Sequence, residues 1–171
     1  MFQVYDRYAF SLRENVTISD LERTQEGDAA VFNALLNAGG KEILHKVNNK
    51  LDIGLSRLFD SEGVELSGGE LQKIALARAI YRRCSVMILD EPSAALDPYA
   101  ENEMLKSMEE NTRGKIVIFT AHRLSTVFIA DRILVLEDGT VVEAGTHEEL
   151  LCKQGKYAKL YQTQAGKYSI R

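Results

Sequence analysis

Residues Leu66–Glu70 read Leu-Ser-Gly-Gly-Glu, and an amphipathic run follows them at Leu71–Tyr81. The chain then continues into a short apolar stretch, Val86–Leu89, which ends in the acidic pair Asp90 and Glu91. This order predicts a loop, a helix, a buried strand and two carboxylates at the carboxyl end of that strand. Because ligands of open α/β sheets bind at the carboxyl ends of the strands, the stretch predicts an α/β fold with a ligand site beside the acidic pair.

The segment Leu66–Glu70 allows two interpretations. Ser67 and Glu70 have the S-x-x-E spacing of a capping box, in which each side chain satisfies a backbone N–H group of the other residue. A capping box does not explain Gly68 and Gly69, because glycine costs about 1 kcal/mol relative to alanine in a helix interior. Backbone N–H groups at a helix N-terminus that no Cβ covers form an anion site. From this stretch alone, the cap and the anion site both remain open.

The composition is that of a globular protein, with 45% apolar and 27% charged residues in a chain of 171. A net charge of -4 gives no support for nucleic acid as a partner. Cys84 and Cys152 have no metal-binding or redox spacing, which suggests a reducing compartment. No apolar run approaches the roughly 20 residues that cross a bilayer.

Hydrophobic spacing and turn residues predict the other elements. Helices are expected after a capping box at Ser19 and Glu22, at Ala29–Ala38, at Lys41–Val47, from an N-cap at Asp97 to Asn111, at Ser125–Ala130, after a capping box at Thr146 and Glu149, and at about Lys156–Gln164. Further strands are expected at Lys115–Thr120, which should be buried, and at Arg132–Glu137 and Thr140–Glu143, which the turn Asp138-Gly139 joins. We expect His45 and His147 on helix surfaces. The pattern indicates an α/β layer that carries a helical insertion.

Five segments occur in the order and spacing of the nucleotide-binding domain of ATP-binding cassette (ABC) transporters, which the chain resembles over essentially its whole length. They are Gln3 for the Q-loop, Leu66–Glu70 for the signature, Val86–Glu91 for Walker B, Ser93–Asp97 for the D-loop and His122 for the switch histidine. Phe10–Val16 and Asp131–Leu150 resemble the exporter branch. The resemblance implies a partial P-loop NTPase-like (RecA-like) α/β sheet with helices and an all-α signature subdomain. That subdomain would span about residues 12–82, and the C-terminal part of the α/β core about residues 83–171.

The Walker A loop of the family, G-x-x-x-x-G-K-[ST], is absent from the sequence. The Gly-Lys pairs, none of which precedes Ser or Thr, are Gly40-Lys41, Gly114-Lys115, Gly155-Lys156 and Gly166-Lys167. The backbone cradle for phosphates and its lysine are therefore missing. We expect the chain to be the C-terminal part of a cassette, from the Q-loop onward, and to be inactive alone. Glu70 is a second departure, because many members of the family have Gln there.

The resemblance implies a role for each matched residue. Asp90 and Gln3 would hold Mg²⁺, Glu91 would be the base that polarises the attacking water, and His122 would contact the γ-phosphate. In a head-to-tail dimer, the signature would bind ATP held by a second nucleotide-binding domain; the residues concerned are Leu66, Ser67, Gly68, Gly69 and Glu70. Asp97 would lie at the dimer interface. In isolation, the acidic pair is a solvated turn, His122 a surface histidine and Asp97 a helix N-cap.

The function implied is an ATP-binding and hydrolysing domain that powers an exporter of the multidrug, peptide or lipid type. It would work at the cytoplasmic face of the membrane with transmembrane domains as partners. One alternative is an inert structural or interaction fragment. Another is a soluble ABC-type ATPase of DNA repair or translation, which would predict long heptad segments or basic faces that the sequence lacks. Because missing strands would leave unpaired backbone groups, we expect self-association through a sheet edge.

Overall fold

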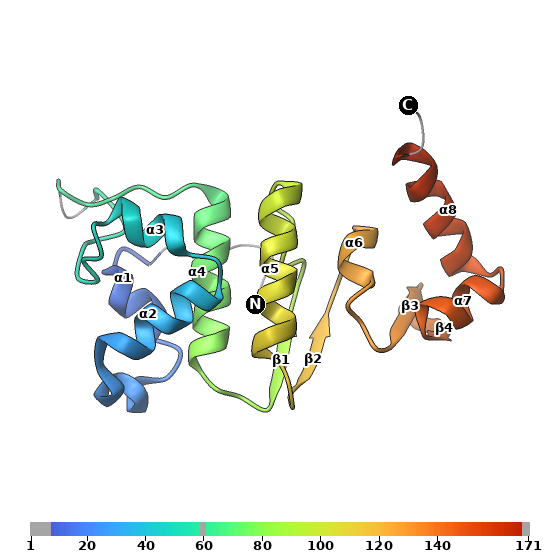
Figure 1. Cartoon of the computed structure of the whole chain (residues 1–171), viewed down its shortest axis with the longest axis horizontal. Helices are drawn as coiled ribbons and strands as arrows, with labels where there is room; N and C mark the ends of the chain where they lie inside the picture. Colours follow the sequence, from blue (N-terminus) through green and yellow to red (C-terminus); the bar gives the residue numbers. More distant parts are fainter. Residues whose placement is uncertain (1–7, 59–60, 169–171) are drawn as a thin grey trace. The chain divides into compact units, whose positions relative to one another are not determined.

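The computed structural model describes residues 8–58 and 61–168, which fall into two compact units, one ending at Thr120 and one beginning at Ala121 (Figure 1). Gln3, the expected Q-loop glutamine, lies outside the described residues. Every helix among the described residues is too short or too polar to cross a lipid bilayer.

The first unit begins with a group of helices, two of which pack on α4 (Gly68–Tyr81). In chain order they are α1 (Leu12–Thr17), the 3-10 helix η1 (Leu21–Glu26), α2 (Gly27–Asn37), α3 (Lys41–Lys46) and α4 (Gly68–Tyr81). α4 contacts both α1 and α2. The core of this part is formed by Leu12, Val16, Val31, Leu35, Ile43, Ile74 and Leu76, all nearly or completely buried. Arg78 of α4 adds a polar anchor, because its guanidinium donates to the backbone and side-chain oxygens of Asn15 on α1.

The start of α1 corrects one sequence prediction. Its capping box is formed by Ser11 and Glu14, whereas the box predicted at Ser19 and Glu22 is wrong. The hydroxyl of Ser19 instead donates to the carbonyl of Val16 at 3.0 Å, in the last turn of α1. The segment that follows is therefore a 3-10 helix without a side-chain cap.

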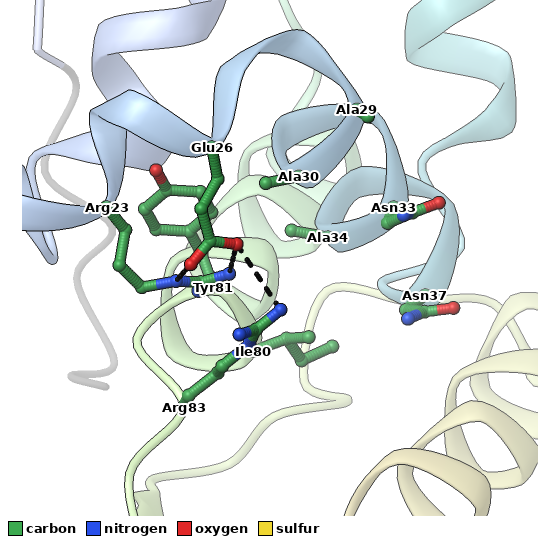
Figure 2. A pocket seen from close by; sticks show the side chains of 10 residues that line it. All are labelled: Arg23, Glu26, Ala29, Ala30, Asn33, Ala34, Asn37, Ile80, Tyr81 and Arg83. Atoms are coloured by element: carbon green, nitrogen blue, oxygen red, sulfur yellow. Dashed lines mark hydrogen bonds and ion pairs between the residues drawn. The ribbon is translucent and has the colours of Figure 1, made fainter.

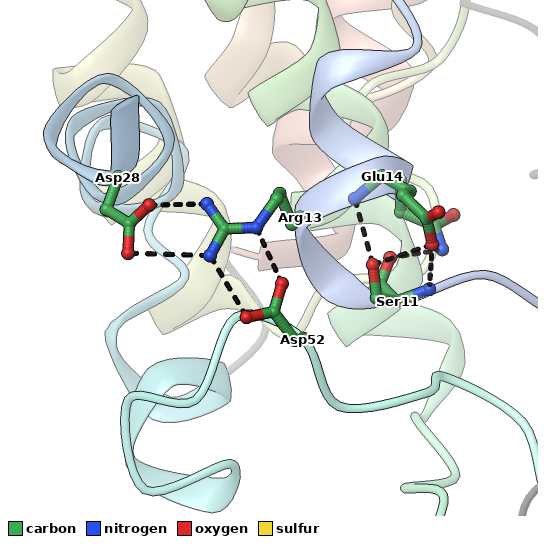
Figure 3. A network of polar contacts seen from close by, with 6 residues as sticks. Ser11, Arg13, Glu14, Asp28 and Asp52 are labelled. Carbon is green, nitrogen blue, oxygen red and sulfur yellow. Dashed lines mark hydrogen bonds and ion pairs between the residues drawn. The ribbon is translucent and has the colours of Figure 1, made fainter. Parts of the chain in front are cut away.

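One arginine ties the start of α1 to two other segments of the helical part (Figure 3). The guanidinium of Arg13 donates to Asp28 at 2.5 Å and to Asp52 at 2.6 Å. Hydrogen bonds to Asp52 and then Asp28 raise the pKa of Arg13 above its ordinary value. Because both carboxylates are largely exposed, the network fixes geometry more than it adds stability.

The first unit ends in a parallel pair of strands, β1 (Val86–Leu89) and β2 (Ile116–Phe119), with α5 (Pro98–Asn111) between them in sequence. Helices α2, α3 and α5 confirm the predicted helices to within two residues, and α4 begins three residues before the predicted run Leu71–Tyr81. The prediction of buried strands is wrong for one face. Leu89 is fully buried, but Val86 and Ile88 are 48% and 62% exposed, and Ile116 and Ile118 on β2 are exposed as well. Within the described residues, this two-stranded sheet is covered on one side only.

The second unit contains α6 (Leu124–Val127), the antiparallel hairpin β3 (Ile133–Glu137) and β4 (Thr140–Gly145), α7 (His147–Cys152) and α8 (Lys156–Tyr168). The predicted hairpin is confirmed, and both turn residues have positive φ, 47° at Asp138 and 75° at Gly139, as a type I′ turn requires. The predicted capping box of Thr146 and Glu149 is confirmed at the start of α7.

His147 is half-buried, so its predicted place on a helix surface is wrong. Its Nδ1 lies 2.7 Å from the hydroxyl of Tyr157, and its ring packs against Phe128 and Tyr161. His45 is exposed on α3, as predicted. The periodicity of a short helix did not reveal the aromatic cluster, because its members come from three separate segments.

Candidate functional site

The Leu-Ser-Gly-Gly-Glu segment forms the N-terminus of α4. The Ser67 hydroxyl accepts a hydrogen bond from the N–H of Glu70 at 3.3 Å, and the Glu70 carboxylate accepts one from the N–H of Ser67 at 2.7 Å. This confirms the predicted capping box. Leu66 is buried and fixes the approach of the loop, while Ser67 and Gly68 are exposed.

Gly68 leaves the start of α4 uncovered, whereas Gly69 lies close to the loop that follows β1. A Cβ atom at Gly68 would meet no other atom within 4 Å, and one at Gly69 would lie 3.4 Å from the carbonyl oxygen of Ala95, an ordinary contact. Nothing in the described chain therefore requires glycine at position 68. The N–H groups of a 14-residue helix point outward there, next to the positive end of its dipole. This geometry suits an approaching anion.

Glu70 is committed to the cap. Burial alone would raise its pKa, but hydrogen bonds from the Ser67 N–H, the Lys46 ammonium and the Ser67 hydroxyl outweigh burial and hold the pKa below its ordinary value. The ammonium of Lys46 lies 3.0 Å from the carboxylate and also donates to the carbonyl of Glu65. Glu70 is thus ionised at neutral pH, and its charge is balanced within the chain.

The acidic pair is fixed by a residue from the neighbouring strand. The hydroxyl of Thr120, directly after β2, donates to Asp90 at 2.6 Å and accepts from the N–H of Glu91 at 2.9 Å. Glu91 has φ +45°, a left-handed conformation that costs a residue other than glycine about 1–3 kcal/mol. Thr120 was missed in the sequence, although its place at the end of the adjacent parallel strand is the signal that could have found it.

A buried glutamine links the acidic turn to the signature helix. Gln72, in the second turn of α4, donates to the carbonyl of Glu91 at 3.2 Å and accepts from the N–H of Ala95 at 3.1 Å. No local pattern in the sequence indicates this role of Gln72. The turn then enters α5 at Asp97, whose carboxylate accepts from the N–H groups of Tyr99 and Ala100, so the predicted N-cap is confirmed. The hydrogen bond from the N–H of Ala100 is the main cause of the lowered pKa of Asp97.

The structure therefore brings the signature, the acidic pair and the Asp97 turn together in the first unit. His122 belongs to the second unit, where it is exposed and its carbonyl accepts a hydrogen bond from Gln164 of α8 at 2.9 Å. Gln3 lies outside the described residues. Over the part of the chain that the structure describes, no group of three or more His, Cys, Asp or Glu side chains could hold a metal ion by itself.

A hollow of about 270 Å³ lies at the opposite end of α4 (Figure 2). Figure 2 shows the Glu26 carboxylate between Arg23 and Arg83, at 2.7 and 3.3 Å, with the Arg23 guanidinium over the ring of Tyr81. A helix of 14 residues is about 20 Å long, so this hollow is remote from Gly68. Because Glu26 already occupies the space between the two arginines, the hollow is not the candidate anion site.

A model of the ABC transporter family matches residues 5–94, more than half of the chain. The chain belongs to this family. It is 40% identical over 152 residues to the ATP-dependent lipid A-core flippase of Acinetobacter baylyi, which covers 89% of this chain and 25% of the flippase. It is also 40% identical over 166 residues to the nisin transport ATP-binding protein NisT of Lactococcus lactis subsp. lactis, which covers 96% of this chain and 27% of that protein.

Among solved structures, a bacterial Atm1-family ABC exporter with ATP bound superimposes with a TM-score of 0.79 at 30% identity. The match covers 92% of this chain and 26% of the exporter, so the ABC chain spans about a quarter of the length of these relatives. The predicted resemblance to exporter nucleotide-binding domains is confirmed, and so is the fold class, an α/β fold of the P-loop NTPase kind in partial form.

Proposed function

We propose that this chain forms part of the ATP-binding and hydrolysing domain of an ABC exporter of the multidrug, peptide or lipid type. The observation that carries the proposal is that Gln72 joins a helix with an uncovered N-terminus, at Ser67 and Gly68, to the turn that contains the anchored acidic pair. The transport functions in the names of the lipid A-core flippase and NisT support the exporter assignment.

The residues present fit ATP and Mg²⁺. Exposed N–H groups at the start of α4 suit a γ-phosphate, and Gly68 leaves room for it. Mg²⁺ is typically held by one or two carboxylates together with phosphate oxygens and water, so Asp90 can serve without a protein cage. Bound Mg²⁺ would neutralise charge that develops on the phosphates.

Each site residue then has a defined task in the proposal. Thr120 donates to Asp90 and so orients its carboxylate for the cation. Glu91 accepts a proton from the attacking water, a contribution worth about 10²–10⁴ in rate. His122 contacts the γ-phosphate, and Gln3 completes the metal site. We also propose that residues 12–82 form the helical signature subdomain and residues 83–171 the C-terminal part of the α/β core.

The proposed partners are a second nucleotide-binding domain, arranged head to tail, and the transmembrane domains of the transporter. The proposed location is the cytoplasmic face of the membrane. The 171 residues contain no Walker A loop, so the signature would act on ATP that the second domain holds. The chain alone would then be inactive. Glu91 would act only on a nucleotide that a Walker A loop binds beside it.

A complementation assay tests this proposal. The chain is mixed with a family nucleotide-binding domain that carries Walker A but whose own signature is disabled, and phosphate release from Mg-ATP is followed. We expect hydrolysis only in the mixture. Gly68→Asp should abolish the stimulation, because the added carboxylate repels the phosphate at a position with open space.

Glu91→Gln in the chain is the matched control and should leave the stimulation intact, since the second domain supplies its own base. A mixture without stimulation would favour the alternative, an inert interaction module. Stimulation that Gly68→Asp leaves unchanged would show that the signature does not contact ATP.

A further inference from the structure

The side chain of Gln72 is completely buried, which is unusual for a residue with a neutral polar amide. A buried amide is costly unless its donor and acceptor are both satisfied. Here the nitrogen donates to the carbonyl of Glu91 and the oxygen accepts from the N–H of Ala95. One side chain of the signature helix therefore holds the turn after β1 at two points, four residues apart.

The backbone at Glu91 needs such support. A residue other than glycine stays at positive φ only where its surroundings over-determine the conformation. Three hydrogen bonds fix the backbone of Glu91. The Gln72 amide and the N–H of Ala94 both donate to its carbonyl, and the Thr120 hydroxyl accepts from its N–H. Gln72 is the member of this set that comes from α4.

The first turn of α4 also lies close to the same loop. A Cβ atom added at Gly69 would lie 3.4 Å from the Ala95 oxygen and 3.5 Å from a methyl group of Leu96. The N–H of Ala95 donates to Gln72, so the loop is hydrogen-bonded to α4 at Gln72 and lies close to α4 at Gly69, three positions earlier. A shift of the signature turn therefore shifts the loop as well.

We propose that Gln72 is a positioning residue that couples the signature to Glu91 within one chain. A phosphate that binds at Ser67 and Gly68 moves the first turn of α4, and Gln72 transmits that movement to the backbone of Glu91. This inference rests on the proposed function. It adds to that function a link between the signature, which binds ATP held by the partner domain, and the acidic turn, which contains Glu91.

Nuclear magnetic resonance of the full chain tests the coupling without any need for turnover. Gln72→Leu keeps the volume and removes both hydrogen bonds. We expect amide exchange at Ala95 to accelerate by about tenfold or more, and the carbonyl ¹³C resonance of Glu91 to shift. Leu76→Val is the matched control, a change at a fully buried position of the same helix. It should weaken protection across the unit without moving the Glu91 carbonyl resonance.

Gln72→Glu separates the two bonds and remains informative if the leucine variant does not fold. The ionised carboxylate keeps the acceptor for Ala95 and loses the donor to Glu91, whereas protonation at low pH restores the donor. We expect the Glu91 carbonyl shift to return toward its wild-type value as this variant is protonated. Resonances of Glu91 and Ala95 that change no more in Gln72→Leu and Gln72→Glu than in Leu76→Val would overturn the proposal.

Addition of a Walker A-bearing partner domain loaded with Mg-ATP distinguishes this inference from the proposed function. The partner should move the Glu91 carbonyl resonance of the wild type and leave it unmoved in Gln72→Leu. A complex that moves the resonance equally in both proteins overturns the coupling. Failure to form any complex contradicts the proposed function, and the resonance changes of the free variants then decide the role of Gln72 by themselves.

Discussion

Replacement of Gly68 by alanine should make the chain more stable and its proposed site worse. Gly68 is the first residue of α4, its φ is not in the left-handed region, and a Cβ would meet no atom within 4 Å. Alanine at such a position reduces the entropy of the unfolded chain, and the expected gain is about 0.4–1 kcal/mol in the free energy of unfolding. Urea denaturation followed by far-ultraviolet circular dichroism measures it.

The same substitution at Gly114 is the matched control. Its Cβ would also stand in open space, but Gly114 has φ +76°. Alanine is strained in that conformation by about 1–2 kcal/mol, so Gly114→Ala should lower the free energy of unfolding. The opposite signs of the two changes separate backbone conformation from steric room.

The ligand side of the prediction uses the complementation assay. A methyl group at position 68 stands over the N–H groups of the first turn, so Gly68→Ala should reduce the stimulation of the partner domain by about tenfold or more, as expected for a lost charge-assisted hydrogen bond. A destabilised Gly68→Ala protein would refute the open geometry at the helix start. Full stimulation by a stabilised variant would refute the idea that glycine is there for a ligand.

Three further changes probe the supports of the site and of the second unit. Ser67→Ala should lower the free energy of unfolding by about 1 kcal/mol and raise the pKa of Glu70. The stability that the ionised Glu70 adds is present above its ordinary pKa and is lost as the pH falls through the lowered value. An NMR titration in which the pKa of Glu70 is unchanged would contradict this. Thr120→Val removes two hydrogen bonds to the acidic pair and should cost about 1–3 kcal/mol, so an unaltered urea midpoint would count against their importance. In Gly155→Ala the new Cβ would collide with the Glu143 carboxylate that caps α8, so the first two amides of α8 should exchange about five- to thirtyfold faster; unchanged exchange would show that the cap is dispensable.

Signals that act over a few residues were readable from the sequence. The capping box of Ser67 and Glu70 and the Asp138-Gly139 turn are complete within four residues, and both occur as predicted. The capping box predicted at Ser19 and Glu22 is wrong, and the reason is also local. Ser11 and Glu14 have the same S-x-x-E spacing and cap α1, which ends at Thr17, so the Ser19 hydroxyl binds the carbonyl of Val16 in the last turn of that helix.

Contacts between distant segments were not readable. Gln72 lies among apolar positions of an amphipathic helix, and nothing around it indicates that its amide is used 19 and 23 residues later. Thr120 reaches Asp90 across 30 residues. The half-exposed strands show the same limit, because a run such as Val86–Leu89 predicts burial on both faces only if another layer covers each face.

The most direct test of the account is a calorimetric titration of the purified chain with Mg-ATP, with phosphate release followed in the same sample. In the proposed function, the nucleotide is first bound by a Walker A loop, which these 171 residues lack. We therefore expect neither saturable binding nor turnover by the chain alone. Saturable binding with turnover that Glu91→Gln abolishes would contradict it, and would mean that other residues of this chain hold the phosphates.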